Sequence, residues 1–185
     1  VEIGNTDAEG RLLLGDALWI DFINTARGRE VNPPDRLPEP PAYHRWTKAQ
    51  KLASDADAVP WEEVLDFRAR LLTVASALAE ERQPPSSAIL EINRMLARTA
   101  GHHHLTRVGG AWQLAFAPLR TATALEAVAR SAAQTLADPA VRVRRCRAEP
   151  CSLFFVDRSP GFSRTWCSAE PEAHPVRVDR RRAYR

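Results

Sequence analysis

All three cysteines of this 185-residue chain lie in its last 45 residues, at Cys146, Cys151 and Cys167. An odd number of clustered thiols, in a chain whose start lacks the basic and apolar regions of a secretion signal, favours metal ligation or reactivity over a disulfide framework. The first two cysteines are close enough in sequence to clamp one ion from a knuckle turn. Residues 153–156 then predict a short strand, and a turn at Pro160-Gly161 can return the third cysteine to the other two.

This spacing predicts a small zinc module. A structural zinc ion takes four tetrahedral ligands, mainly thiolate sulfur and imidazole nitrogen, and a segment with few large apolar side chains needs such a staple. Because only three thiolates are present, a fourth ligand must be found. His174, seven residues after Cys167, is the preferred candidate, and Glu172 is the second choice because oxygen ligands are unusual in thiolate-rich structural sites. The alternative is a chain that has lost the metal and keeps buried thiols.

Positive charge is concentrated in the same segment. The whole chain carries a net charge of +3 with 44% hydrophobic and 26% charged residues, which is an ordinary globular composition. Residues 141–185 hold 11 arginines against 5 acidic residues, a net charge of +6, whereas residues 1–140 hold 15 basic and 18 acidic residues, a net charge of −3. Charge and cysteine usage therefore predict two domains, at residues 1–140 and 141–185.

The longer domain is expected to be mainly helical. Apolar spacing predicts one helix over residues 61–82 and a second that begins at Ser86 or Ser87, and these two helices should pack as a helical hairpin. Thr123 and Glu126 form a capping-box pattern that begins a third helix, which Asp138-Pro139 closes.

The remaining segments of this domain are shorter. Residues 12–23 are compatible with a helix or a buried strand, of which we favour the helix, and a short helix is expected over residues 46–52, after a proline-rich loop at residues 32–41. Residues alternate in polarity on both sides of Gly109-Gly110, which predicts a β-hairpin. The predicted fold class is therefore mainly α with a small β-hairpin (α+β), followed by a small zinc-finger-like module.

Candidate functional residues in the longer domain are few. The histidines at 102–104 favour a solvated strand end over a metal site, because successive strand side chains alternate faces. Asp16, Asp21 and Asn24 lie in the most apolar run, where they either line a ligand pocket or provide caps and core hydrogen bonds. Four tryptophans are expected in the core: Trp19, Trp46, Trp61 and Trp112. With no phosphate loop, nucleophile elbow or paired catalytic carboxylates, the chain is not expected to be an enzyme.

The C-terminal segment contains the pattern Arg144-Arg145-Cys146-x4-Cys151-x2-Phe154-Phe155-x-Asp157-x-Ser159-x4-Arg164-x-Trp166-Cys167-Ser168. This pattern resembles the CGNR zinc-finger family, in which the module closes an N-terminal ABATE domain in bacterial stress-induced transcription regulators. Residues 12–25 resemble the start of the ABATE domain, and Gly109-Gly110-Ala111-Trp112 resembles its later portion. The resemblance implies the three cysteines as zinc ligands. Family members place a fourth cysteine where this chain has Glu172-Ala173-His174-Pro175, so His174 rests on chemistry alone.

The end of the chain is rich in arginine, which can contact nucleic-acid phosphates. The candidate nucleic-acid contacts are Arg164, Arg177, Arg180, Arg181 and Arg182. The leading hypothesis is a cytoplasmic, DNA-binding transcription regulator, with a homodimer as its candidate assembly, whose N-terminal domain senses a small-molecule effector or a partner. The alternative is a small-molecule-binding or protein-interaction protein whose degenerate finger is only structural. No apolar run reaches the length of about 18–20 residues that a membrane span needs.

Overall fold

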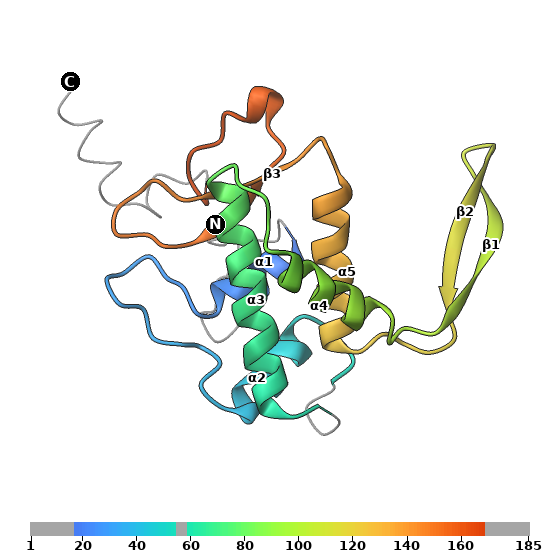
Figure 1. Cartoon of the computed structure of the whole chain (residues 1–185), viewed down its shortest axis with the longest axis horizontal. Helices are drawn as coiled ribbons and strands as arrows, with labels where there is room; N and C mark the ends of the chain where they lie inside the picture. The colour runs from blue at the N-terminus through green and yellow to red at the C-terminus, as the bar shows by residue number, and fades with distance from the viewer. Residues whose placement is uncertain (1–16, 55–58, 169–185) are drawn as a thin grey trace, which may run out of the picture.

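The computed structural model describes residues 17–54 and 59–168, which form a helical body and two antiparallel β-hairpins (Figure 1). The fold is α+β, as predicted. The helices are α1 (Leu18–Asn24), α2 (Pro40–Ala49), α3 (Trp61–Ala79), α4 (Ser86–Leu96) and α5 (Ala124–Ala137). The strands are β1 (Gly101–Val108), β2 (Ala111–Pro118), β3 (Arg142–Arg145) and β4 (Phe154–Asp157). No helix in the described part of the chain is both long enough and apolar enough to span a membrane.

Helix α1 lies at the centre of the body. Its six residues after Leu18 are all buried, because a short helix that is apolar nearly all round can be satisfied only by packing on every side. It packs against α3, α5 and β4. The indole nitrogen of Trp19 donates to Thr135 Oγ1 at 3.0 Å, which satisfies its polar atom inside the core. The favoured helix within residues 12–23 is confirmed for the part that the structure describes.

Helix α2 begins earlier than predicted, at Pro40, inside the segment expected to be a loop. A proline at the first helical position costs nothing, because its missing N–H would have no intrahelical partner there. The helix buries Tyr43 and Trp46 against α1, with the rings of Phe22 and Trp46 centred 5.2 Å apart. The loop before α2 is held by Arg68 of α3, which donates to both carboxylate oxygens of Asp35 at 2.8 and 2.5 Å.

The other helices follow the predicted pattern with shifted ends. Helix α3 ends at Ala79, and α4 has Pro85 rather than a serine at its N-cap. Helix α5 has the predicted capping box: Thr123 Oγ1 accepts from the Glu126 amide at 3.5 Å, and Glu126 accepts from the Thr123 amide at 3.0 Å. Helices α4 and α5 pack together, as do α3 and α4, which form the predicted helical hairpin.

Strands β1 and β2 form the predicted hairpin, which projects from the body (Figure 1). Gly109 and Gly110 make its turn with φ of 58° and 87°, and two consecutive positive φ angles are what a two-residue type I′ turn requires. The histidines at 102–104 are exposed on β1, in agreement with the solvated strand end. The expectation for Trp112 was wrong: this residue is 69% exposed, because no other element among the described residues packs extensively on this hairpin, whereas Trp19 and Trp46 are buried.

The β3–β4 hairpin packs on the body rather than apart from it. Val141, Val143, Phe154 and Val156 belong to the main hydrophobic core, together with residues of all five helices. Strand β3 lies against α3, and β4 lies against α1. The segments predicted as residues 1–140 and 141–185 therefore share one core.

Candidate metal centre and basic surface

The three cysteines converge on one buried site. Cys146 follows β3, Cys151 precedes β4, and Cys167 comes after a 3-10 turn at Pro160–Phe162. Their sulfur atoms all lie within 4.8 Å of one another, and the Sγ atoms of Cys151 and Cys167 are 3.9 Å apart. Two thiolates of a tetrahedral zinc site are about 3.8 Å apart when each Zn–S bond is about 2.3 Å. The geometry and chemistry of the three donors therefore suit a zinc ion.

Backbone hydrogen bonds hold the three cysteines in place. The Cys146 amide donates to the Leu153 carbonyl at 2.9 Å, which extends the β3–β4 pairing by one residue. The Cys151 amide donates to the Ala148 carbonyl at 2.7 Å, which forms the knuckle turn, and the Cys167 amide points at Cys146 Sγ at 3.5 Å. A small apolar cluster surrounds the sulfur atoms: Ala148, Leu153, Phe155 and Trp166.

The thiols differ in acidity. Hydrogen bonds with Cys151 and then with Cys167 lower the pKa of Cys146. Hydrogen bonding to Cys146 raises the pKa of both Cys151 and Cys167. Metal ligation requires deprotonated thiols, so a divalent cation that binds here displaces the protons that the cluster holds.

The loop before Cys167 is held by Asp157, Ser159 and Arg164, which belong to the sequence pattern described above. Asp157 is fully buried, and its Oδ1 accepts from the amide and the hydroxyl of Ser159 at 2.9 and 2.6 Å. Burial raises the pKa of Asp157, but the two Ser159 hydrogen bonds and the charge of Arg144 outweigh it, so that the net pKa is lowered. Ser159 Oγ in turn accepts from the amides of Ser163 and Arg164 at 2.9 and 3.1 Å. These contacts explain the Asp-x-Ser-x4-Arg part of the pattern.

The guanidinium of Arg164 closes this loop. It donates to the carbonyls of Val156, Trp166 and Cys167 at 3.3, 2.9 and 2.6 Å. Its carbon lies 4.6 Å from the centre of the Phe155 ring, which adds a cation–π contact. Its nitrogens are therefore engaged with the backbone around the metal centre, and a contact between Arg164 and nucleic acid stays a prediction.

The body contributes directly to this module through Asn24. Its side-chain Nδ2 donates to the Phe154 carbonyl at 2.9 Å, and its Oδ1 accepts from the Phe154 amide at 3.0 Å. The amide group thus pairs with β4 as a neighbouring strand would. Of the two roles considered for Asn24, the structure shows core hydrogen bonding. Gly28 and Ser152 add a backbone bond nearby, from the Ser152 amide to the Gly28 carbonyl at 2.8 Å.

Two arginines after α1 also lie beside the metal centre. Arg29 Nη2 is 3.9 Å from Cys167 Sγ, where a cation stabilises thiolate charge. Burial and then the charge of Arg145 lower the pKa of Arg27. Sequence reasoning missed both residues, because their distance of more than a hundred positions from the cysteines hides the contact. Their only local signal was the cationic Arg-Gly-Arg triplet just after Asn24-Thr25.

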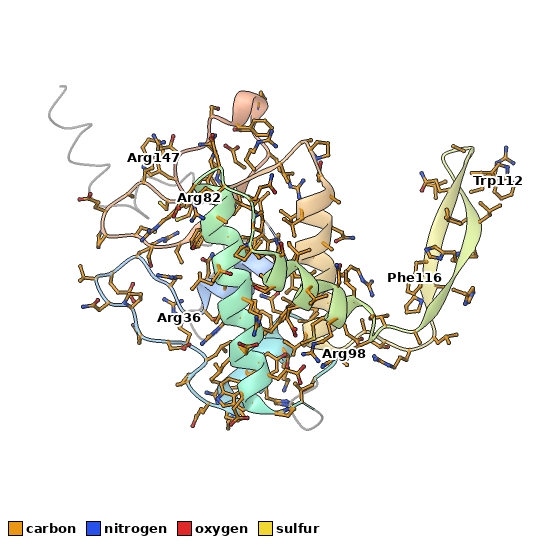
Figure 2. The ribbon with its side chains drawn as sticks, in the orientation of Figure 1. Arg36, Arg82, Arg98, Trp112, Phe116 and Arg147 are labelled. Atoms are coloured by element: carbon orange, nitrogen blue, oxygen red, sulfur yellow. The ribbon has the colours of Figure 1, made fainter. Side chains whose placement is uncertain are left out.

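A cavity of about 470 Å³ opens between the end of α3 and the finger. Among the residues that the structure describes, four arginines line it, whereas Glu80 is the single acidic residue in its wall and is already paired with Arg82 at 2.6 Å. The arginines are Arg144, Arg145, Arg147 and Arg164. Arg145 and Arg147 are exposed on either side of Cys146, and no ion pair involves either of them within the described residues (Figure 2 shows Arg147).

The other predicted site residues lie outside the described ranges. These are the metal-ligand candidates His174 and Glu172, Asp16 of the apolar run, and the candidate nucleic-acid contacts Arg177, Arg180, Arg181 and Arg182.

The class of protein is thus a helical domain that carries a three-cysteine finger at its C-terminal end. Residues 16–139 match the model of the ABATE family, described as "Putative stress-induced transcription regulator". Because this match covers more than half of the sequence, the chain belongs to the ABATE family. Residues 142–185 match the CGNR zinc finger. No curated protein matches this chain.

Proposed function

We propose that this protein is a DNA-binding transcription regulator whose finger contacts the phosphate backbone. The observation that carries the proposal is the arginine-lined cavity beside the cysteine cluster, with Arg145 and Arg147 exposed and without acidic partners among the described residues. Phosphate oxygens are the acceptors that arginine recognises best in this setting. The family description supports the regulatory role.

The competing hypothesis requires the arginines to be neutralised by the acidic body. Within the described part of the chain, one such pair joins Arg158 to Asp138 at 3.1 Å, and Arg144 pairs with Asp157 inside the finger. The described part of the finger, residues 141–168, still holds six arginines against two acidic residues. A surplus of positive charge therefore remains on its surface, which favours a polyanionic partner.

Zinc is the cofactor in this proposal. Cys146, Cys151 and Cys167 supply three thiolates, and His174 supplies the fourth ligand, in place of the family's fourth cysteine. The ion would hold the finger in shape and carry out no chemistry, so no residue is given a catalytic role. The helical body is assigned the sensing of an effector or partner, and the protein is assigned to the cytoplasm, where DNA is accessible.

Fluorescence anisotropy with a labelled random-sequence duplex tests the DNA contact. The test uses the full chain, because deleting residues 141–185 would remove four side chains of the main core. The double variant Arg145→Glu with Arg147→Glu should weaken binding by roughly tenfold or more. It should also reduce the slope of log K against log salt by about two, since two phosphate contacts are lost.

The matched control makes the same charge change on α2, with Arg45→Glu and Lys48→Glu, which are exposed at the far end of the body from the finger (Figure 1). This variant should bind nearly as well as the wild type. Equal losses in both variants would mean that only net charge matters, and unchanged binding in the finger variant would refute the proposed contact.

A further inference from the structure

The projecting β1–β2 hairpin has two chemically different faces. Residues paired across an antiparallel ladder share a face, so Leu105 and Leu114 lie together, as do Arg107 with Trp112 and His103 with Phe116. The opposite face carries small or polar pairs such as Thr106 with Gln113. The hairpin is therefore amphipathic, like a sheet built to cover a core.

Nothing in the described part of the chain covers the apolar face. Leu105, Trp112 and Leu114 are 66%, 69% and 69% exposed, and Phe116 is 43% exposed. Neither strand packs extensively on any other described element. Figure 2 shows Trp112 near the tip of the hairpin and Phe116 closer to its base, well away from the helices. An isolated two-stranded hairpin with this much exposed apolar surface is marginal in water and calls for a partner.

The chemistry of the face argues against nucleic acid as that partner. Arg107 is its one permanent cation, and it already lies over the Trp112 ring at 5.8 Å. The centre of the face is the Leu105–Leu114 pair, which offers nothing to phosphates and little to base edges. An apolar protein surface suits it better.

The chemistry of the face favours a second copy of this chain as its binding partner. Two copies related by a two-fold axis present the same surface to each other, so each apolar patch meets an identical one. An antiparallel arrangement would set one leucine pair on the other, and each Trp112 near the partner's Phe116. It would also hold the two Arg107 side chains at opposite ends, without repulsion.

The area is sufficient for such a contact. The four large side chains of the face expose on the order of 500 Å² of apolar surface per chain. Two faces packed together would therefore bury on the order of 1,000 Å², which is the lower bound for a specific protein–protein interface. We propose that the β1–β2 hairpin is a dimerisation arm, through which two copies of this chain pack the faces defined by Leu105, Trp112, Leu114 and Phe116 against each other.

Sedimentation velocity of the full chain at a series of concentrations tests the arm. The wild type should sediment as a dimer that dissociates on dilution. The variant Leu105→Lys with Leu114→Lys should dissociate at concentrations at least roughly tenfold higher, because it places charges at the centre of the contact. The matched control, Thr106→Lys with Gln113→Lys, puts the same charges on the opposite face and should remain dimeric. Circular dichroism should be the same for all three proteins.

Cross-linking gives a second readout that does not depend on weakening the arm. A Leu105→Cys variant should form a covalent dimer under mild oxidation, and a Thr106→Cys variant should not. A wild type that is monomeric at every concentration, or a dimer that survives the lysine pair at Leu105 and Leu114, would overturn the proposal. The proposal would also be overturned if the wild type were monomeric and the variant Leu105→Lys with Leu114→Lys bound a short duplex more weakly than the wild type does, since the arm would then be a nucleic-acid contact.

Discussion

Asn24 shows how much one side chain can contribute to this fold. Its amide satisfies both backbone groups of Phe154 in a buried environment, so that β4 is hydrogen-bonded on the side facing α1. Asparagine suits this position because its side chain carries a donor and an acceptor in the geometry of a peptide group.

Replacing Asn24 with alanine should therefore leave two buried backbone groups unsatisfied. We expect a loss of about 2–4 kcal/mol in the free energy of unfolding, measured by urea denaturation. Asn93→Ala, an exposed position on α4, is the matched control and should change stability little. If the free energy of unfolding of Asn24→Ala falls as little as that of Asn93→Ala, water replaces the missing hydrogen bonds.

The individual residues differ in how far sequence could assign them. The convergence of the three cysteines was predictable, because their spacing and residue type are local features of the sequence, whereas their role as metal ligands stays a prediction. Asn24 remained ambiguous between pocket and core, since its partner lies 130 positions away. Arg27 and Arg29 were missed for the same reason, and the scaffold role of Arg164 depends on a loop whose path no local pattern indicates.

Among the elements, α5 combines a capping box with an ion pair between the buried Glu126 and the half-exposed Arg120. Glu126 accepts from Arg120 at 2.9 and 2.5 Å and from the Thr123 amide. Burial raises the pKa of Glu126, but the Arg120 hydrogen bonds and the Thr123 amide outweigh it, and the net pKa is lowered. A lowered carboxyl pKa contributes stability that is present above the unfolded pKa of about 4.3 and is lost as pH falls through the folded pKa.

The variant Glu126→Gln should accordingly cost about 1 kcal/mol at neutral pH, or about 2–4 °C in Tm. The difference in Tm from the wild type should narrow as the pH falls below about 4, and it should be smallest below the folded pKa of Glu126, where the wild-type carboxylate is protonated in the native state as well. Thermal melts followed by circular dichroism measure both quantities. Glu81→Gln, at an exposed position, serves as the control. A difference in Tm between Glu126→Gln and the wild type that does not change with pH would contradict the stabilising role of the Glu126 carboxylate.

Helical periodicity and turn chemistry predicted most elements, and the exceptions have physical causes. Helix α2 was predicted too late because prolines that usually interrupt helices here occupy its first turn, where they are tolerated. The alternation in residues 111–116 correctly predicted a strand, but it also implied a buried Trp112. Alternation along a strand predicts one apolar face, and it does not indicate whether another part of the same chain packs against that face.

At the scale of the whole molecule, the finger and the body share one core. Val143, Phe154 and Val156 pack among residues of the five helices, whereas the cysteines lie in a small adjoining cluster joined to that core through β3 and β4. Disturbance of the metal centre should therefore be felt by the helices.

Removal of zinc with a chelator should lower the Tm of the entire chain in a single transition, by an amount corresponding to about 3 kcal/mol when zinc is present at a hundred times its dissociation constant. Far-UV circular dichroism, which reports mainly on the helices, measures this transition. Elemental analysis should find one zinc ion per chain.

The same measurements test the fourth ligand. His174→Ala should contain less zinc and should melt at the Tm of the chelator-treated wild type. Glu172→Ala should retain the zinc content and the Tm of the untreated wild type. Wild-type protein without zinc, or a Tm insensitive to the chelator, would show that the thiols are only buried side chains.

The hydrogen-bonded pairing of Asn24 with β4 also bears on how such proteins evolve. Because the finger supplies part of the core of the helical body, it cannot be exchanged between proteins as an independent module. Recombination that moved residues 142–185 onto an unrelated partner would expose Val143 and Val156 and leave the Phe154 backbone unpaired. Lineages carrying this type of finger should therefore inherit it together with its helical body, and insertions between the two should be confined to residues 138–140, the short connection between the end of α5 and Val141 of the core.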